Sequence, residues 1–152
     1  MQNAIQAFKE KDSGLNKFFA EAYGYAVFPS VIKGGAFAFG GAYGKGQVFE
    51  KGVVIGDASV SQGSVGFQLG GQSYSEIVFF KDKEALARFK SGNLKFAAQA
   101  SAVAVTEGVA ANAAYDNGVA VFSLPRKGLM VEAAIGGQRF VFKPSARQNA
   151  AN

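Results

Sequence analysis

The chain has 152 residues, 49% of them hydrophobic and 18% charged, with 16 Lys and Arg against 11 Asp and Glu. This length and composition indicate one globular domain rather than a disordered chain, and no apolar run reaches the length of a membrane-spanning helix. Cysteine and histidine are absent, which excludes thiol nucleophiles, imidazole bases and zinc sites built from either residue. The net charge of +5 favours anionic partners, although solubility alone also explains it.

Residues 3–22 are predicted to be helical, with a break at Asp12–Gly14 where Asp12 or Ser13 could cap a second helix. The second helix places its large apolar residues at intervals of three and four, which predicts packing on the sheet that follows. These residues are Leu15, Phe18 and Phe19. The first helix has an apolar face beside a basic residue, and that face either packs on the sheet or lies on a membrane. It consists of Ile5 and Phe8, with Lys9 beside them.

The stretch from Tyr23 to Gly46 predicts an apolar strand, a turn that carries Lys33, and an alternating strand rich in glycine. Pro29 lacks a backbone donor and is therefore expected at a strand edge or end. The glycines mark either tight turns and close backbone approaches or a phosphate-binding loop. The first interpretation is favoured, because neither P-loop spacing nor a following helix is present.

The rest of the chain predicts hairpins around one helix. Glu50–Gly52 is a glycine-containing hairpin turn. Residues 82–90 form the clearest helix, capped by Asp82, with Leu86 and Phe89 facing inward. Residues 94–114 alternate small and apolar side chains and are interpreted as one bent strand or two. Asp116–Gly118 is a strong hairpin signal, with a positive φ expected at Asn117 or Gly118.

The sequence therefore predicts an α+β fold. A strongly curved, barrel-like antiparallel sheet would be covered by the N-terminal helices and by one further helix. One domain is expected over residues 1–144, helical at 3–22 and mainly β at 24–143 apart from helix 82–90. Recurrent glycine pairs support the curvature; these are Gly40–Gly41, Gly70–Gly71 and Gly136–Gly137. Residues 145–152 are expected to form a disordered tail.

No catalytic residue, metal site or cofactor is predicted. The serines lack the Gly-x-Ser-x-Gly elbow of hydrolases, and most acidic residues lie beside lysines or in turns, where solvation explains them. A calcium site at Asp116 and Asn117 is conceivable, but the turn accounts for both residues. Basic residues are scattered singly without a nucleic-acid motif, so no nucleic-acid partner is expected.

Several blocks, in one order from about Phe18 to Pro144, resemble the SYLF domain family. They are Gly24–Pro29, Ser30–Gly35, Gly70–Tyr74, Ile77–Phe80, Phe89–Asn93, Gln99–Val105, Tyr115–Phe122 and Lys127–Met130. SYLF domains bind lipids and regulate actin beside Src-homology-3 and FYVE modules in eukaryotes, and occur alone in bacterial exported proteins. The resemblance is to the bacterial single-domain type, for which actin and phosphoinositides are the less favoured partners.

The resemblance implies binding to anionic phospholipids through basic turns and an amphipathic N-terminal helix. The candidate lipid-binding residues are Lys33, Lys45, Lys51, Arg126, Lys127, Ile5, Phe8 and Lys9. A structural or protein-interaction domain of the bacterial envelope, with an unknown protein partner and no lipid, is the alternative. A periplasmic or outer-membrane-associated location is expected, with a leader or lipoprotein signal that Met1 replaces, and a cytoplasmic location stays open.

Overall fold

The computed structural model describes residues 2–33, 42–62, 73–91, 103–105, 108–115, 117–125 and 138–145. The helices are α1 (Gln2–Lys11), α2 (Leu15–Glu21) and α3 (Lys83–Lys90), together with the 3₁₀ helix η1 (Val109–Asn112). The strands are β1 (Gly24–Lys33), β2 (Ala42–Glu50), β3 (Val53–Gln62), β4 (Ser73–Phe80), β5 (Val103–Ala104), β6 (Val119–Pro125) and β7 (Gln138–Pro144).

The strands form one seven-stranded sheet in the order β5-β6-β4-β1-β2-β3-β7. All neighbouring pairs are antiparallel except β5 and β6, which are parallel. The predicted α+β class is therefore confirmed. The predicted barrel is not confirmed, because among the described strands β5 and β7 lie at the two ends of an open order.

The sheet is strongly curved. Phe28 of β1 and Phe140 of β7 lie three strand positions apart in the sheet, a separation of about 14 Å if the sheet were flat. Their ring centroids are 5.7 Å apart, and the ring of Phe89 in α3 lies 5.3 Å from that of Phe140. The sheet therefore coils around an apolar interior, which we call the inner face, with α3 against it.

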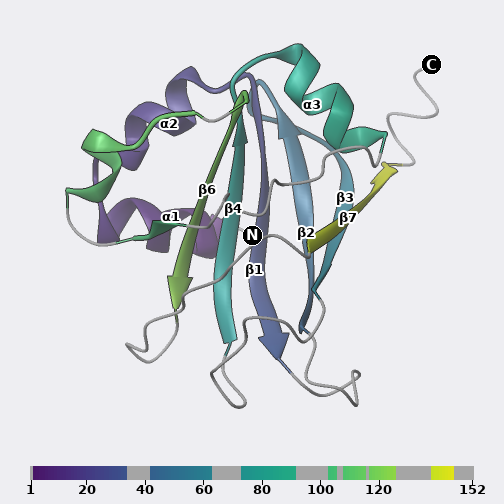
Figure 1. The fold of residues 1–152 in the computed structure, drawn as a ribbon, viewed down its shortest axis with the longest axis horizontal. Coiled ribbons are helices and arrows are strands. Elements are labelled where there is room, and N and C mark those ends of the chain that lie inside the picture. The colour runs from purple at the N-terminus through teal and green to yellow at the C-terminus, as the bar shows by residue number, and fades with distance from the viewer. Residues whose placement is uncertain are drawn as a thin grey trace.

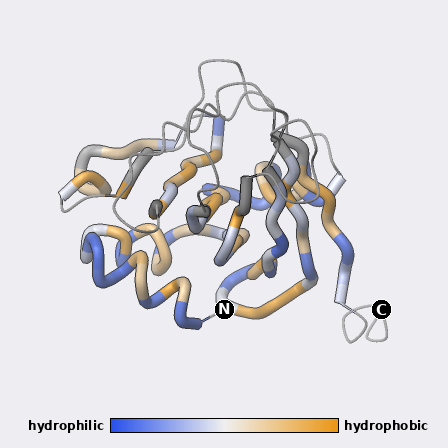
Figure 2. Tube along the Cα trace, turned by 90° about the horizontal axis from the view of Figure 1, so that it is seen from below, coloured by the Kyte–Doolittle hydropathy of each residue, from blue (hydrophilic) through white to orange (hydrophobic). Residues whose placement is uncertain are grey.

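Helices cover the sheet from both sides (Figure 1). The inner face packs against Leu86 and Phe89 of α3, which are buried as predicted. The outer face of β6, β4 and β1 packs against α1 and α2 through a second apolar cluster. Hydrophilic and hydrophobic residues alternate along the helices, as Figure 2 shows beside the N-terminus. The predicted packing of Leu15 and Phe18 on the sheet is confirmed, since both are buried.

The predicted helix cap, the β2–β3 turn and the positive φ near Asn117 are all found, but the hairpin expected at Asn117 is not. Asp82 caps α3 by accepting a hydrogen bond from the Ala85 amide at 2.9 Å. The hairpin turn between β2 and β3 consists of Lys51 and Gly52, whose φ angles are 52° and 83°. The φ of Asn117 is also positive, at 54°. The segment before Asn117 contains η1 instead of a strand, so the predicted hairpin there is wrong.

The prediction for Pro29 is also wrong, because Pro29 lies within β1, a central strand, rather than at an edge or end. The pairing of β1 shifts register on both sides around this residue, and such a bulge tolerates the missing donor. On β2, Gly46 faces the bulge. A Cβ there would clash with the Val27 carbonyl oxygen and lie 2.8 Å from the Phe28 ring. This glycine is therefore explained by close backbone approach.

Other predictions fall outside the described residues. These are the three glycine pairs, Asp116 and the tail beyond Ser145. Of the 94–114 stretch, β5 confirms a strand at only two residues, and residues 109–112 form η1 instead.

Candidate functional site

The outer face of the sheet has two halves. In the covered half, formed by β6, β4 and β1, aromatic rings of α2 and of the strands interlock. The Phe18 centroid lies 5.3 Å from Phe79 and 5.2 Å from Phe122, and Phe19 lies 5.0 Å from Phe79. The Lys9 amine lies 4.9 Å from the Phe19 centroid. These contacts pack α1 and α2 on the sheet.

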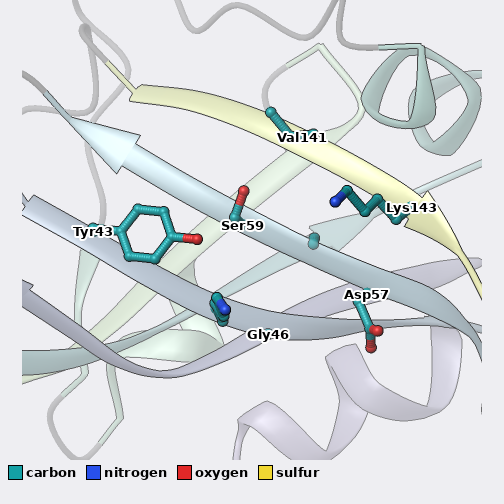
Figure 3. Close-up of a pocket in the computed structure, with 8 residues that line it drawn as sticks. Tyr43, Gly46, Asp57, Ser59, Val141 and Lys143 are labelled. Atoms are coloured by element: carbon teal, nitrogen blue, oxygen red, sulfur yellow. The ribbon is translucent and has the colours of Figure 1, made fainter.

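The open half is the continuation of this face over β2, β3 and β7. Residues that pair directly on antiparallel strands share a face. Lys45 pairs with Ser59, and Ser59 pairs with Val141. Asp57 pairs with Lys143 two residues further along the strands, and therefore on the same face. A shallow pocket of about 430 Å³ lies here, and Figure 3 shows its lining residues on three adjacent strands. They are Tyr43, Lys45, Gly46, Asp57, Ala58, Ser59, Val141 and Lys143.

The large hydrophobic side chains that are exposed all belong to β2, β3 and β7 in the described part of the chain. Tyr43, Val54 and Val141 are 36%, 40% and 46% exposed. Val54 pairs with Phe49 and therefore lies on the outer face, like Tyr43 and Val141. Val53, at the hairpin end of β3, is 65% exposed. The open half thus combines exposed apolar groups with amines and hydroxyls.

The open half offers charged and hydroxyl side chains to a partner. Lys45 and Lys143 against Asp57 leave an excess of one positive charge, and both lysines are exposed to water. Tyr43 and Ser59 add hydroxyl groups that donate or accept hydrogen bonds. Across the ranges that the structure describes, no three acidic side chains come together to hold a metal ion. The same ranges contain no helix that is long and apolar enough to cross a membrane.

Among the predicted basic residues, the backbone positions of Lys33 and Lys51 lie far apart. Lys45, expected in a turn, lies inside β2 and is part of the open half. Lys51 occupies the β2–β3 turn, whereas Lys33 ends β1 at the opposite end of the sheet. Pairing of Gly24 with Glu50 and of Lys33 with Ala42 separates the two positions by the length of β1, roughly 30 Å. The side chain of Lys33, and all of Arg126 and Lys127, lie outside the described residues.

The expected membrane-facing side of α1 is turned inward. Ile5 is 6% exposed and Phe8 is fully buried in the cluster under α1 and α2. In this structure they form part of the core and are not an exposed apolar face, which corrects the expectation of a surface helix. A role in insertion would require α1 to leave the sheet.

Asp12 forms a second polar centre, between α1 and α2. Its carboxylate accepts hydrogen bonds from the amides of Gly14 (3.0 Å), Gly108 (3.2 Å) and Ala110 (2.7 Å). Burial alone would raise the pKa of Asp12, but the bonds from Ala110, Gly14 and Gly108 together lower it. The predicted capping role is wrong: Gly14 occupies the N-cap position of α2, and this cap makes no side-chain hydrogen bond to the first amides of the helix. Asp12 instead fastens η1 to the helical layer.

A pocket of about 520 Å³ lies beside this centre, between α2 and η1. Tyr115 lines it, and burial together with the charge of Glu21 raises the pKa of Tyr115 to about 12. This phenol therefore stays protonated and neutral at physiological pH. Neither Asp12 nor Tyr115 was a predicted site residue.

Sequence reasoning also missed Tyr43, Val53, Val54, Val141 and Lys143. A signal was present in β7, where Phe140 and Phe142 alternate with Val141 and Lys143. Such alternation places Val141 and Lys143 on one face. The sequence does not indicate whether a helix covers that face. The strand order of the structure shows that no described helix does.

A model of the Ysc84 family, described as Las17-binding protein actin regulator, matches residues 61–150. The chain belongs to this family, whose domain is also called SYLF. The resemblance found in the sequence is therefore confirmed. Membership indicates a lipid- or actin-related domain that binds or regulates.

The chain is also similar to Beta cell expansion factor A of Aeromonas veronii. The two are 27% identical over 147 residues, which cover 90% of this chain and 51% of that protein. The SYLF chain described here thus spans about half the length of this bacterial relative.

Proposed function

We propose that this SYLF domain is a non-enzymatic module that binds anionic phospholipid membranes, and that the open half of its sheet faces the membrane. One observation carries the proposal: the exposed large hydrophobic residues of the described chain gather on β2, β3 and β7, together with Lys45, Lys51 and Lys143. Membrane-binding surfaces combine apolar groups that enter the interface with basic groups that attract acidic headgroups.

The charge contribution is modest and additive. Each lysine near an acidic membrane contributes about 1 kcal/mol, and this attraction falls off over a Debye length of ~8 Å at physiological salt. Lys45 and Lys143 therefore act only when the open half lies close to the headgroups. Lys33, Arg126 and Lys127 stay sequence-based predictions on which this proposal does not depend, since Lys33 lies roughly 30 Å from the β2–β3 turn. Ile5 and Phe8 are not part of the proposal, because their burial stabilises the fold.

The test is co-sedimentation with phosphatidylglycerol vesicles against phosphatidylcholine vesicles. The variant Lys45→Glu/Lys143→Glu changes the net charge from +5 to +1, since each reversal removes two charges. Its matched control, Lys83→Glu/Lys90→Glu, makes the same change on α3, which packs on the inner face. We expect at least about ten-fold weaker binding to acidic vesicles for the first variant and a smaller loss for the control.

Equal losses in the two variants would show that net charge, and not the open half, governs binding. Equal binding of the wild type to both vesicle types would contradict the preference for anionic lipid. If neither vesicle is bound, the protein-interaction alternative takes precedence. Sedimentation with actin filaments belongs in the same series, because the family is described as an actin regulator.

We further propose that the module acts at a bacterial envelope membrane, on its periplasmic or outer-membrane side. Its similarity to a protein of Aeromonas veronii supports a bacterial setting, and the periplasmic or outer-membrane side follows the expectation from the sequence resemblance. Fractionation of a native bacterial host tests this location. Recovery in the cytoplasmic fraction would contradict it without bearing on lipid binding.

A further inference from the structure

The turn between β2 and β3 forms one end of the open half. β2 ends at Glu50 and β3 begins at Val53, so Lys51 and Gly52 alone form the loop. Both have positive φ angles, 52° and 83°, as in the type I′ turn that matches the natural twist of a hairpin. A two-residue loop of this kind has little freedom to fold back over neighbouring residues.

Contacts to the start of β1 hold this turn in place. The Lys51 amide donates a hydrogen bond to the Tyr23 carbonyl oxygen at 2.9 Å. The Tyr23 hydroxyl donates to the Glu50 carboxylate, and the Lys51 amine lies 5.3 Å from the Tyr23 ring centroid. The turn is therefore positioned before any partner binds, so docking would cost little additional ordering.

Two adjacent valines lie exposed directly after this turn. Val53 is 65% and Val54 is 40% exposed, although neighbouring strand residues normally place one side chain inward. The inner-face core begins only with Ile55, which is 4% exposed. Val53, and the exposed part of Val54, therefore lie outside the packed core, and their exposure needs another explanation.

The charge beside the valines favours one kind of partner. Lys51 is exposed at the turn, next to Glu50, whose carboxylate accepts a hydrogen bond from Tyr23. Lys143 lies on the same sheet, opposite Asp57 and about 13 Å from Val53 along β3. A small apolar tip with basic residues behind it matches a bilayer with acidic headgroups, where valines enter the acyl boundary and amines stay among phosphates. The alternative to a membrane is that the protein's own chain after Ser145 covers the valines, because the Ser145 amide donates a hydrogen bond to the nearby Ile55 carbonyl oxygen at 3.0 Å.

We infer that Lys51–Val54, which we call the hairpin tip, is the element that inserts into the membrane, with Val53 and Val54 in the acyl boundary. The inference rests on the proposed lipid binding and adds the point and direction of entry. The hairpin tip enters first, and Lys45 and Lys143 follow along the open half.

The chain contains no tryptophan, so a single tryptophan reports its own surroundings without background. Val53→Trp places the reporter in the hairpin tip, and Ala87→Trp places a matched reporter on the exposed side of α3. With phosphatidylglycerol vesicles we expect a blue shift of Val53→Trp emission and quenching by brominated acyl chains. We expect neither change for Ala87→Trp.

A second variant, Val53→Asp/Val54→Asp, tests insertion without a probe. Binding to the same vesicles at about 1 M salt, where the Debye length is ~3 Å, isolates the apolar contribution. We expect about ten-fold weaker binding or more than for the wild type under these conditions. Val53 is 65% and Val54 is 40% exposed, so only a small loss of stability is expected, and thermal unfolding of this variant measures it.

The outcomes separate the two proposals. If Val53→Trp co-sediments with vesicles but its emission stays that of water, the hairpin tip does not insert and lipid binding stands. A blue-shifted Val53→Trp emission without vesicles would show that the protein's own chain covers the hairpin tip, which also overturns the inference. If Val53→Asp/Val54→Asp binds vesicles at high salt as well as the wild type does, the inference is also overturned. Failure of the wild type to bind any vesicle would overturn the proposed function and the inference together.

Discussion

Strands β6, β4 and β1 present their outer face to α1 and α2. Strands β2, β3 and β7 present the continuation of that face to water, apart from Phe49 of β2, which is buried in the covered cluster. In the covered half, Phe79 contacts four aromatic rings and is fully buried. In the open half, the equivalent alternate positions carry Lys45, Ser59 and Lys143. The comparison shows that strand alternation determines which side chains share a face. Whether a helix covers that face then determines whether its side chains stabilise the fold or stay accessible to a partner.

The boundary between the halves runs along β1 and β2, where the bulge at Pro29 faces Gly46. Before the bulge, the outer residues of β1 are Tyr25 and Val27, both of which belong to the covered cluster. After it, Ser30 pairs with Lys45 of the open half. The change from apolar to polar character therefore coincides with a change in strand register.

The largest effect should come from the covered half. Phe79→Ala removes a ring that contacts Phe18, Phe19, Tyr25 and Phe122, so it should lower the free energy of unfolding by about 3–5 kcal/mol. Urea denaturation followed by circular dichroism measures this change. A loss below about 1 kcal/mol would mean that the aromatic cluster is not a principal source of stability.

An intermediate effect should come from the polar contact that secures the helical layer. Asp12→Ala leaves the amides of Gly108 and Ala110 without their acceptor, at a cost of about 1–3 kcal/mol at neutral pH. Because the pKa of Asp12 is lowered in the folded state, its contribution is complete above the unfolded pKa of about 3.9. The contribution is lost as pH falls through the folded pKa.

The stabilities of Asp12→Ala and wild type should therefore differ most at neutral pH and converge in acid. Urea denaturation over a pH series measures the difference. A constant difference down to acidic pH would contradict the role of the charged carboxylate.

The smallest effect on stability should come from the open half. Val141 is 46% exposed, so Val141→Thr, which keeps the shape of the side chain, should change the free energy of unfolding by less than about 0.5 kcal/mol. Its melting temperature should stay close to that of the wild type. A clear destabilisation would show that another part of the chain covers the open half, and the contrast between the halves would disappear.

Helix caps and tight turns could be predicted from the sequence because a few neighbouring residues determine them. The Asp82 cap, the inward side chains of α3 and the turn at Lys51 and Gly52 follow from capping and φ preferences. Pairing over long sequence distances determined the features that were missed. The register of β1 places Pro29 at a bulge, and the strand order leaves Val141 and Lys143 uncovered.

The first helix shows a different limit. An amphipathic helix presents the same pattern whether its apolar side meets a sheet or a membrane. Ile5 and Phe8 were therefore equally compatible with either surface, and the structure places them in the core.

The hydrogen bonds of Asp12 also bear on the order of folding events. Two of them join Asp12 to Gly108 and Ala110, 96 and 98 positions later in the chain. Bonds that close so long a loop carry an entropic cost, and we expect them to form after the sheet. Interactions that form after the transition state slow unfolding and leave the folding rate nearly unchanged. We therefore expect Asp12 to stabilise the domain only after the sheet has formed. In stopped-flow experiments, Asp12→Ala should accelerate unfolding while refolding keeps its rate.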